Sequence, residues 1–208
     1  MVFLFCYTKP MTKYVLNSGG MRNNPDGAKR FFAELLKGIK NDPKILLCLF
    51  AQPREVWEEK YTAYVEAFRE FMPEGVKPAY KMAMPASFKE DVADSDVIYC
   101  HGGDDHLSKY WFSQLDIPNV WEGKVVGTNS ATTQVLSKHF WTCDWRELKD
   151  GLGILPIKTI AHFQSNYGNE DPRGPIDWKK AKSELEEYGD TSLPVYALPE
   201  GEFVVIEK

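Results

Sequence analysis

The chain has 208 residues, of which 43% are hydrophobic and 26% are charged, and its formal net charge is −5. A chain of this length and composition can bury a core of its own, so we expect a single globular domain over residues 1–208 rather than a disordered protein. Its Lys and Arg residues are scattered and form no basic stripe, so nucleic acid is not expected as a partner.

Short apolar runs alternate with longer helical patterns from the start of the chain. Residues 14–16 and 45–51 predict strands, whereas residues 28–39 and 56–71 predict helices. In the second of these helices, aromatic residues recur at spacings of three and four, which indicates a face packed against a sheet. The alternation is typical of a parallel sheet with helices on both faces.

The same alternation continues towards the C-terminus. Further apolar runs predict strands at 79–84, 97–100, 124–127 and 153–162, and helices are predicted at 87–92, 105–114, 131–138 and 177–188. The last two strands, 194–198 and 202–206, are expected to pair as a hairpin through the turn Pro199-Glu200-Gly201. The predicted fold is therefore α/β, a three-layer sandwich with a mostly parallel sheet.

The four cysteines, Cys6, Cys48, Cys100 and Cys143, stand singly in or beside apolar runs. This distribution favours reduced thiols packed in a core over disulfides or a zinc site, and it indicates a cytoplasmic protein. No window reaches the ~20 apolar residues of a membrane helix, and the apolar opening, residues 1–7, is too short for a signal peptide. We expect no metal, no cofactor and no membrane contact.

Two turns of small and polar residues follow apolar strands, His101-Gly-Gly-Asp-Asp105 after 97–100 and Thr128-Asn-Ser-Ala-Thr132 after 124–127. Ligands of doubly wound sheets gather at the carboxyl ends of the strands, so the two turns predict a shared pocket. A Gly-Gly turn with a helix directly behind it presents N–H groups that suit an anion or a developing oxyanion. The alternative is a plain strand-to-helix turn capped by Asp104 or Asp105.

Ser130 heads the second turn and has two interpretations. In a nucleophile elbow, a strained turn projects the serine hydroxyl from the sheet; otherwise Ser130 is only the N-cap of the next helix. A serine nucleophile needs a base, and His162 is placed for that role at the end of a predicted strand. An acid that orients the imidazole could be Asp144, Glu147 or Asp150.

Five segments together form a recognisable pattern of motifs. The first two are residues 46–61, an apolar strand with an aromatic helix, and residues 97–107, with the Gly-Gly turn. The others are Ser130-Ala131 with Val135, residues 151–163 with Leu-Gly-Ile-Leu-Pro and His162-Phe163, and residues 195–201 with Leu-Pro-Glu-Gly. In this order and at these intervals they resemble the dipeptidase E (alpha-aspartyl dipeptidase) family of serine peptidases, which is related to cyanophycinases. The resemblance implies the flavodoxin-like fold of class I glutamine amidotransferases.

The resemblance also implies roles for individual residues. Ser130 would be the nucleophile and His162 the general base, and Asp144 best matches the acid. The backbone N–H groups of Gly103 and Ala131 would form the oxyanion hole. The resemblance implies a small peptide as substrate and a monomer or homodimer. Of the residues in or near the matching segments, we expect Asp104 and Arg173 to contact that substrate.

The sequence departs from the family pattern at several positions. Thr128 and Thr132 replace glycines of the elbow, His101 replaces the first glycine of the Gly-Gly-Gly turn, and an alternative register puts Asn129 at the nucleophile position. Three functions stay open: a serine peptidase for dipeptides or small peptides, an inactive relative that binds a small ligand, and a glutamine amidotransferase-like enzyme. The third would need a cysteine in the elbow, where none is present.

Overall fold

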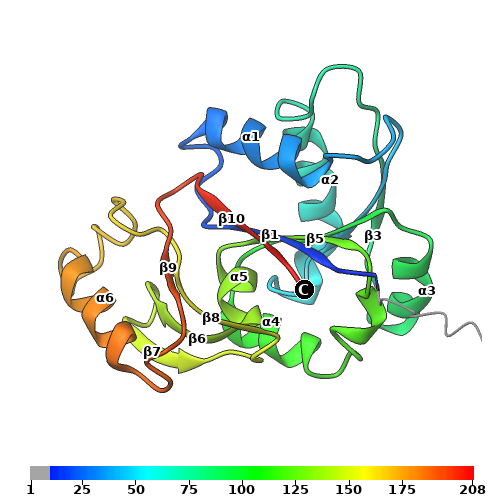
Figure 1. Cartoon of the computed structure of the whole chain (residues 1–208). Coiled ribbons are helices and arrows are strands. Elements are labelled where there is room, and N and C mark those ends of the chain that lie inside the picture. The colour runs from blue at the N-terminus through cyan, green and yellow to red at the C-terminus, as the bar shows by residue number, and fades with distance from the viewer. Residues whose placement is uncertain (1–9) are drawn as a thin grey trace, which may run out of the picture.

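A six-stranded sheet forms the centre of the protein, and the computed structural model, which describes residues 10–208, has helices on both of its faces (Figure 1). Every pair of neighbouring strands is parallel except the pair at one edge, β10 and β1. The strands follow one another across the sheet as β10 (Phe203–Glu207), β1 (Lys13–Asn17), β5 (Val125–Asn129), β4 (Val97–Cys100), β2 (Lys44–Cys48) and β3 (Ala79–Met82).

The helices that cover this sheet lie in two layers. One face carries α1 (Pro25–Leu35) and α2 (Trp57–Phe68), and the other carries α3 (Phe88–Ala93), α4 (Asp105–Phe112) and α5 (Ala131–Leu136) (Figure 1). Short 3-10 helices complete the connections: η1 (Arg54–Val56), η2 (Pro85–Ser87) and η3 (Asn119–Trp121). The predicted α/β layers and mostly parallel sheet of a flavodoxin-like fold are thus confirmed.

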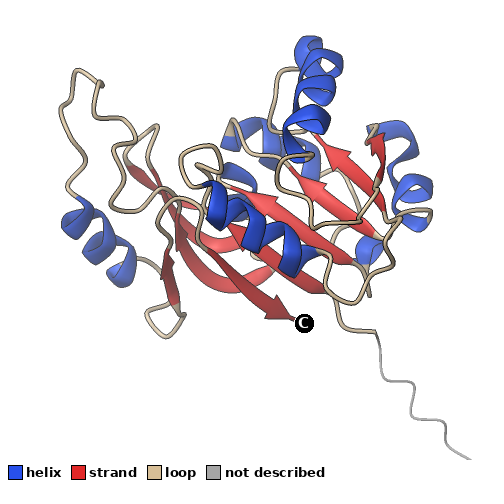
Figure 2. Ribbon diagram, turned by 90° about the horizontal axis from the view of Figure 1, so that it is seen from above, coloured by secondary structure: helices blue, strands red, loops and turns tan. Residues whose placement is uncertain are grey.

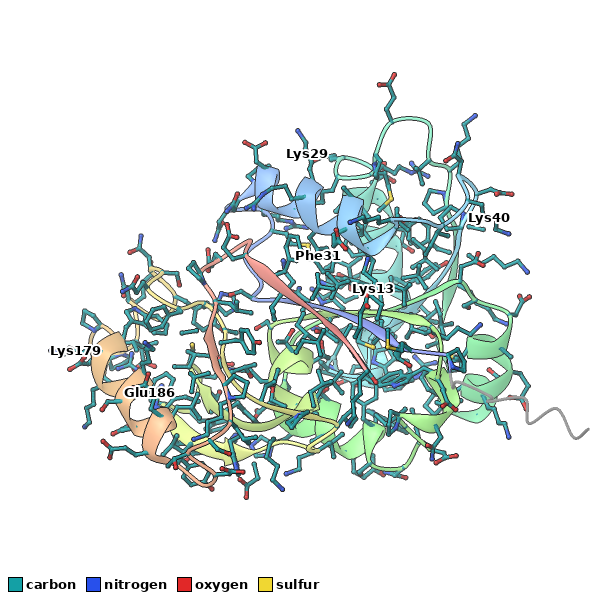
Figure 3. All side chains as sticks on the ribbon, viewed as in Figure 1. Lys13, Lys29, Phe31, Lys40, Lys179 and Glu186 are labelled. Atoms are coloured by element: carbon teal, nitrogen blue, oxygen red, sulfur yellow. The ribbon has the colours of Figure 1, made fainter. Side chains whose placement is uncertain are left out.

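Helix α1 illustrates why these segments pack as they do. Lys29 lies on its outer side and is exposed, whereas Phe31 lies between the helix and the sheet and is fully buried (Figure 3). Phe31 and Phe32 contact the ring of Tyr99 in β4 at centroid distances of 6.0 Å each. Such aromatic pairs add to the free energy gained by burying their area, so they fix the helix on the sheet.

A second sheet lies beyond α5, which packs between the two sheets. Its strands are, in order, β7 (Glu147–Asp150), β6 (Ser137–Thr142), β8 (Leu155–Ile160) and β9 (Val195–Ala197), and α6 (Trp178–Glu187) covers its outer face (Figure 2). The strands β6 and β7 were not predicted, because a helix was expected to continue to residue 138. The helix ends earlier because Ser137 enters a sheet, where its hydroxyl lies 2.9 Å from that of Thr159 in β8.

The predicted hairpin at the end of the chain is wrong. The strand β9 pairs with β8 in the second sheet, and β10 pairs with β1 in the first. The turn Pro199-Glu200-Gly201 therefore carries the chain from one sheet to the other. This crossing brings Glu200 to the carboxyl end of β1.

Three of the cysteines, Cys48, Cys100 and Cys143, are buried free thiols, as predicted. Cys6 and the apolar opening at residues 1–7 lie outside the described residues. Within residues 10–208, every helix is too short or too polar to cross a lipid bilayer.

Candidate active site

Ser130 lies at the turn between β5 and α5 in an unusual backbone conformation. Its φ is 50° and its ψ is −113°, a region that costs a residue with a side chain about 1–3 kcal/mol. The backbone N–H of Ser130 donates to the carbonyl oxygen of Asn17 in β1 at 3.0 Å, which holds the turn in place. The hydroxyl makes no capping hydrogen bond to α5, so the interpretation of Ser130 as a mere helix cap is wrong.

Thr128 and Thr132, which replace glycines of the family pattern, fit into the turn with their side chains buried. Thr128 and Thr132 are 0% and 1% exposed, respectively. The hydroxyl of Thr132 lies 2.7 Å from the carbonyl oxygen of Cys100, and that of Thr128 lies 2.6 Å from the hydroxyl of Thr133. Because their polar atoms are paired, these side chains tie the turn to the sheet rather than distort it.

His162 lies just beyond β8, and its ring reaches Ser130. The Nε2 atom is 3.0 Å from Ser130 Oγ, and the side chain is largely buried. The backbone N–H of His162 donates to Ser18 Oγ at 2.7 Å, and the Ser18 hydroxyl in turn donates to the carbonyl oxygen of Leu198. This chain of hydrogen bonds joins the two sheets and fixes the position of the imidazole between them. The predicted proximity of Ser130 and His162 is therefore present.

The carboxylate bound to the imidazole belongs to Glu200. Its Oε1 atom is 2.8 Å from His162 Nδ1, and its Oε2 atom accepts a hydrogen bond from Asn23 at 2.7 Å. Burial alone would raise the pKa of this carboxyl group, but the hydrogen bonds from Asn23 and His162 outweigh burial and lower it. An ionised Glu200 binds the tautomer with a proton on Nδ1, so Nε2 can accept the proton of Ser130.

Asp144, the acid expected to orient His162, does not contact the imidazole. Its carboxylate accepts a hydrogen bond from the Tyr167 hydroxyl at 2.6 Å. The ring of Tyr167 is stacked on that of His162, with centroids 4.3 Å apart and planes 22° apart. The choice of Asp144 as the direct partner is thus corrected to Glu200, because the Asp144 carboxylate binds the Tyr167 hydroxyl whereas the Glu200 carboxylate binds Nδ1 of the imidazole.

The other acids that lie between serine and histidine in the sequence have partners of their own. Glu147 pairs with Lys149 at 3.6 Å, and Asp150 accepts from His139 at 2.6 Å. Neither is therefore free to orient His162.

Asp104 and Arg173, expected at the substrate, make structural contacts. Asp104 is the N-cap of α4, and its carboxylate accepts from the backbone N–H of Leu107 at 2.8 Å. Arg173 forms an ion pair with Asp171 and donates to the carbonyl oxygen of Asp144 at 2.7 Å. The helix-cap alternative for the Gly-Gly turn is confirmed for Asp104.

The Gly-Gly turn nevertheless lies against Ser130. A Cβ atom on Gly102 would lie 3.1 Å from that of Ser130, and Gly103 has a φ of +147°, which residues with side chains rarely adopt. Within residues 10–208, the N–H groups of Gly103 and Ala131 have no hydrogen-bond acceptor. Both N–H groups are therefore available to a ligand, as an oxyanion hole requires.

Two glycines at the end of β1 let the backbone approach the site. A Cβ atom on Gly19 would lie 2.7 Å from Cε1 and 2.8 Å from Nε2 of His162, and one on Gly20 would overlap the side chain of Glu200. Only glycine fits at these two positions. Their importance was not deduced from the sequence, although Gly19-Gly20 follows a predicted strand as the other two turns do.

Two cavities border this group of residues. One, of about 330 Å³, is lined by Gly20, Arg22, Lys60, Tyr64, His101 and Asn129, among others. The other, of about 540 Å³, is lined by Asn23, Gln164, Ser165, Asn166, Tyr167 and Glu200. We name them the apolar-walled cavity and the polar cavity, since Phe68 and Phe71 line the first and every residue that lines the second has a polar side chain.

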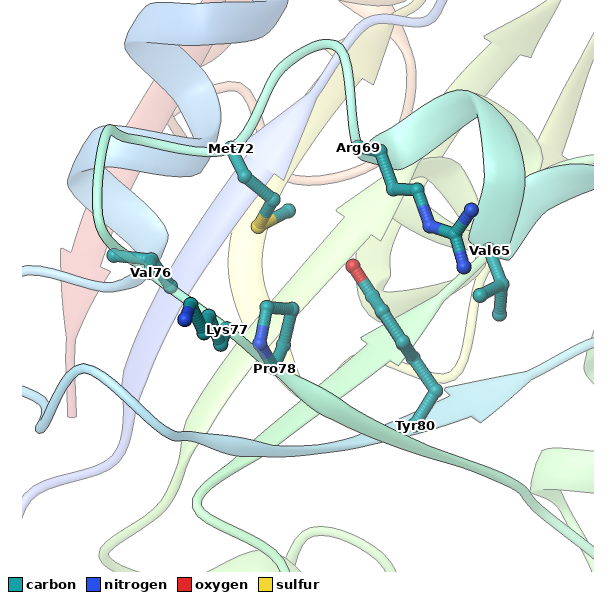
Figure 4. A pocket seen from close by; sticks show the side chains of 7 residues that line it. All are labelled: Val65, Arg69, Met72, Val76, Lys77, Pro78 and Tyr80. Carbon is teal, nitrogen blue, oxygen red and sulfur yellow. The ribbon is translucent and has the colours of Figure 1, made fainter.

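A third cavity lies apart from the site, between α2 and the edge strand β3. It has a volume of about 310 Å³, and Tyr80 points into it beside Arg69 and Met72 (Figure 4). None of its lining residues belongs to the turns that carry Ser130, His162 or Glu200.

His101, which replaces a glycine of the family pattern, forms one wall of the apolar-walled cavity. Its ring is stacked on that of Tyr64 at 3.7 Å between centroids. Burial lowers the pKa of His101 to about 4, and the positive charges of Lys60 and Arg22 act in the same direction. The His101 imidazole in this wall is therefore uncharged at neutral pH. No cluster of three or more His, Cys, Asp or Glu side chains that could hold a metal ion occurs in residues 10–208.

No protein-family model and no curated protein sequence matches the chain. Its structure is similar to the crystal structure of a peptidase from an acI-B1 actinobacterium, with a TM-score of 0.65 and 19% identity over 96% of this chain and 85% of that chain. It is also similar to a candidate peptidase E from Listeria monocytogenes EGD-e, with a TM-score of 0.63 and 16% identity over 95% and 98% of the two chains. The protein therefore has a peptidase E-like fold.

Proposed function

We propose that the protein is a serine-type peptidase that hydrolyses dipeptides or other small peptides, with Ser130 as nucleophile, His162 as general base and Glu200 as the acid that orients the imidazole. The observation that carries this proposal is the continuous set of contacts from Ser130 Oγ to His162 Nε2 (3.0 Å) and from Nδ1 to Glu200 (2.8 Å), with a strained Ser130 at its head. The fold shared with two proteins named as peptidases supports it.

The proposed reaction uses each of these contacts. Ser130 Oγ attacks the carbonyl carbon of the scissile amide while His162 Nε2 takes the hydroxyl proton. The oxyanion of the tetrahedral intermediate accepts hydrogen bonds from the N–H groups of Gly103 and Ala131. His162 then gives its proton to the leaving amine, and the C–N bond breaks. Water, deprotonated by the same imidazole, attacks the acyl ester and releases the acid.

The cavities suit a short substrate. Both lie in the lower part of the range of about 300–1,000 Å³ that is usual for small-ligand sites. The leaving amine must receive its proton from His162, so the polar cavity, bordered by Tyr167 and Glu200, is assigned to the leaving residue. The apolar-walled cavity, bordered by Asn129 and His101, is assigned to the acyl residue.

A fluorophosphonate probe tests the proposal directly, because such probes react with activated serines. The wild-type protein should be labelled, Ser130→Ala should not, and Ser113→Ala, which removes an exposed hydroxyl on α4's C-terminal cap, should be labelled as the wild type is. A panel of dipeptides with acidic and neutral N-terminal residues should then reveal cleavage. Folded wild-type protein that resists the probe would instead favour an inactive relative that binds a small ligand.

A further inference from the structure

Tyr167 covers one face of the His162 imidazole while its own hydroxyl is fixed by Asp144. The two rings are nearly parallel, with centroids 4.3 Å apart, and the hydroxyl donates to Asp144 at 2.6 Å. Burial, together with the neighbouring Asp144 carboxylate, raises the pKa of the Tyr167 hydroxyl, so this group stays protonated and remains a donor. A hydrogen bond to a carboxylate is roughly twice as strong as one between neutral groups.

The loop that carries Tyr167 is tied to the turn that carries Asp144. Arg146 donates to the carbonyl oxygens of Gly168 and Gly174 at 3.2 and 2.5 Å. Arg173, from the far end of the loop, donates to the carbonyl oxygen of Asp144. The stacked tyrosine is thus held by side-chain and backbone contacts from the β6–β7 turn.

The imidazole needs such support for a geometric reason. Its hydrogen bonds to Ser130 and Glu200 lie at opposite nitrogens of the ring, so they leave the ring free to tilt about the line that joins the two partners. A ring stacked on its face restricts this tilt and removes water from that face. Catalytic groups that are misplaced by even a small tilt lose much of their rate advantage.

We propose that Tyr167 is a positioning residue for His162 and that Asp144 acts on the imidazole only through Tyr167. This inference rests on the proposed peptidase function of the Ser130–His162 pair. In this order of action, Asp144 fixes the Tyr167 hydroxyl and the Tyr167 ring fixes the His162 imidazole. Neither Asp144 nor Tyr167 exchanges a proton with the substrate.

Kinetics of fluorophosphonate labelling and of peptide cleavage test the order. Tyr167→Ala should lower the second-order labelling rate and kcat about tenfold, because the imidazole loses its support, and it should raise KM by a smaller factor, because Tyr167 also borders the polar cavity. Tyr167→Phe keeps the stacked ring and should restore the rate to within about threefold of the wild type. A Tyr167→Phe variant as slow as Tyr167→Ala, or a Tyr167→Ala variant as fast as the wild type, overturns the proposal.

A double-mutant cycle tests the role of Asp144. Asp144→Ala should lower the rate by less than Tyr167→Ala does, and it should have no further effect when Tyr167 is already alanine. If Asp144→Ala slows the Tyr167→Ala protein as much as it slows the wild type, Asp144 acts on the site by another route and the proposed order is wrong.

Proton NMR tests the positioning without any need for activity. The ring protons of His162, assigned by their loss in His162→Ala, should be shielded by the Tyr167 ring in the wild type and in Tyr167→Phe, and should move downfield in Tyr167→Ala. Unshielded His162 protons in the wild-type protein overturn the stacked arrangement. If the protons are shielded but no probe labels Ser130, the peptidase function fails while the Tyr167–His162 contact stands, so the two failures are distinguishable.

Discussion

The Nδ1 atom of His162 lies 2.8 Å from the Oε1 atom of Glu200, a residue 38 positions further along the chain. The contact is made where the chain passes from the second sheet to the first, between β9 and β10. This contact favours the tautomer with a proton on Nδ1, and in the proposed mechanism it would stabilise the imidazolium that forms when His162 takes the proton of Ser130.

Glu200→Gln should lower kcat about 10²- to 10⁴-fold, because the amide nitrogen can donate to Nδ1 and so favour the tautomer with a proton on Nε2. In that tautomer Nε2 no longer accepts the proton of Ser130. Cleavage of an active dipeptide, measured by the release of free amine, gives the rate.

Glu202→Gln is the matched control for this substitution. Glu202 lies two residues further on and pairs with Arg30 at the surface, with 42% of its side chain exposed. Its replacement should leave the rate within about twofold of the wild type, since exposed pairs contribute little. Equal losses in the two variants would show that the turn as a whole, rather than the Glu200 carboxylate, matters.

Gly19→Ala should abolish most of the activity while the protein still folds. The added methyl group would lie 2.7 Å from His162 Cε1 and 3.2 Å from Ser130 Cβ, so the imidazole must shift from its present position beside Ser130. The backbone at Gly19 also has a φ of +106°, so alanine adds strain. The expected loss in the labelling rate is at least about 10²-fold, as for other displacements of a catalytic group by about 1 Å.

Gly38→Ala separates backbone strain from contact with the site. Gly38 has a φ of +82°, and nothing lies within 4 Å of the position that a Cβ atom would take. This variant should lose stability, by about 1 kcal/mol or more in a urea titration, and keep its activity. If Gly38→Ala were as inactive as Gly19→Ala, strain alone would account for both results.

The layers of the fold could be predicted because helical and strand periodicities are local. The Ser130–His162 pair was expected because the carboxyl ends of parallel strands meet at one edge of a sheet, but β5 lies in the first sheet and β8 in the second, so the pair forms between two sheets rather than at the edge of one. The sequence showed that Thr128 and Thr132 replace glycines of the family pattern, but it did not show that their hydroxyls are paired in the buried turn.

The acid that partners His162 could not be predicted in this way. Leu198-Pro-Glu-Gly was noticed as a family-like segment, but its glutamate was assigned to a hairpin turn. Glu200 reaches the imidazole only because β9 pairs with β8 while β10 pairs with β1. Pairing between strands so far apart in the sequence cannot be read from the spacing of nearby residues. Position in the chain left Asp144, Glu147 and Asp150 open, and Asp144 was preferred because it best matched the acid of the family pattern. Its actual contact, Tyr167, lies in a loop with no periodic pattern.

Ser130→Gly should be more stable than Ser130→Ala, although neither can form an acyl-enzyme. Both variants lose the hydroxyl, but only glycine adopts a φ of 50° with a ψ of −113° at no steric cost. The expected difference in the free energy of unfolding is about 1 kcal/mol, since part of the relieved strain is offset by the greater freedom of glycine in the unfolded chain. Equal stabilities in a denaturant titration would mean that the turn stores no strain.

Asn23→Ala should destabilise the protein at neutral pH and lose this effect in acid. The hydrogen bond from Asn23 to Glu200 Oε2 helps to lower the pKa of the carboxyl group below its usual 4.5, against the opposing effect of burial. A carboxyl group whose pKa is lowered on folding stabilises the folded state above its unfolded pKa, and this contribution disappears as the pH falls through the folded pKa. The stability difference between wild type and Asn23→Ala should therefore shrink below about pH 4.5, as measured by urea titrations at a series of pH values.

Asn24→Ala is the control, because Asn24 donates to the backbone oxygen of Glu200 and caps α1 through Gly27, so the stability that this variant loses should not depend on the titration of Glu200. A penalty for Asn23→Ala that stays constant down to pH values well below 4.5 would show that Asn23 does not act through the charge of Glu200.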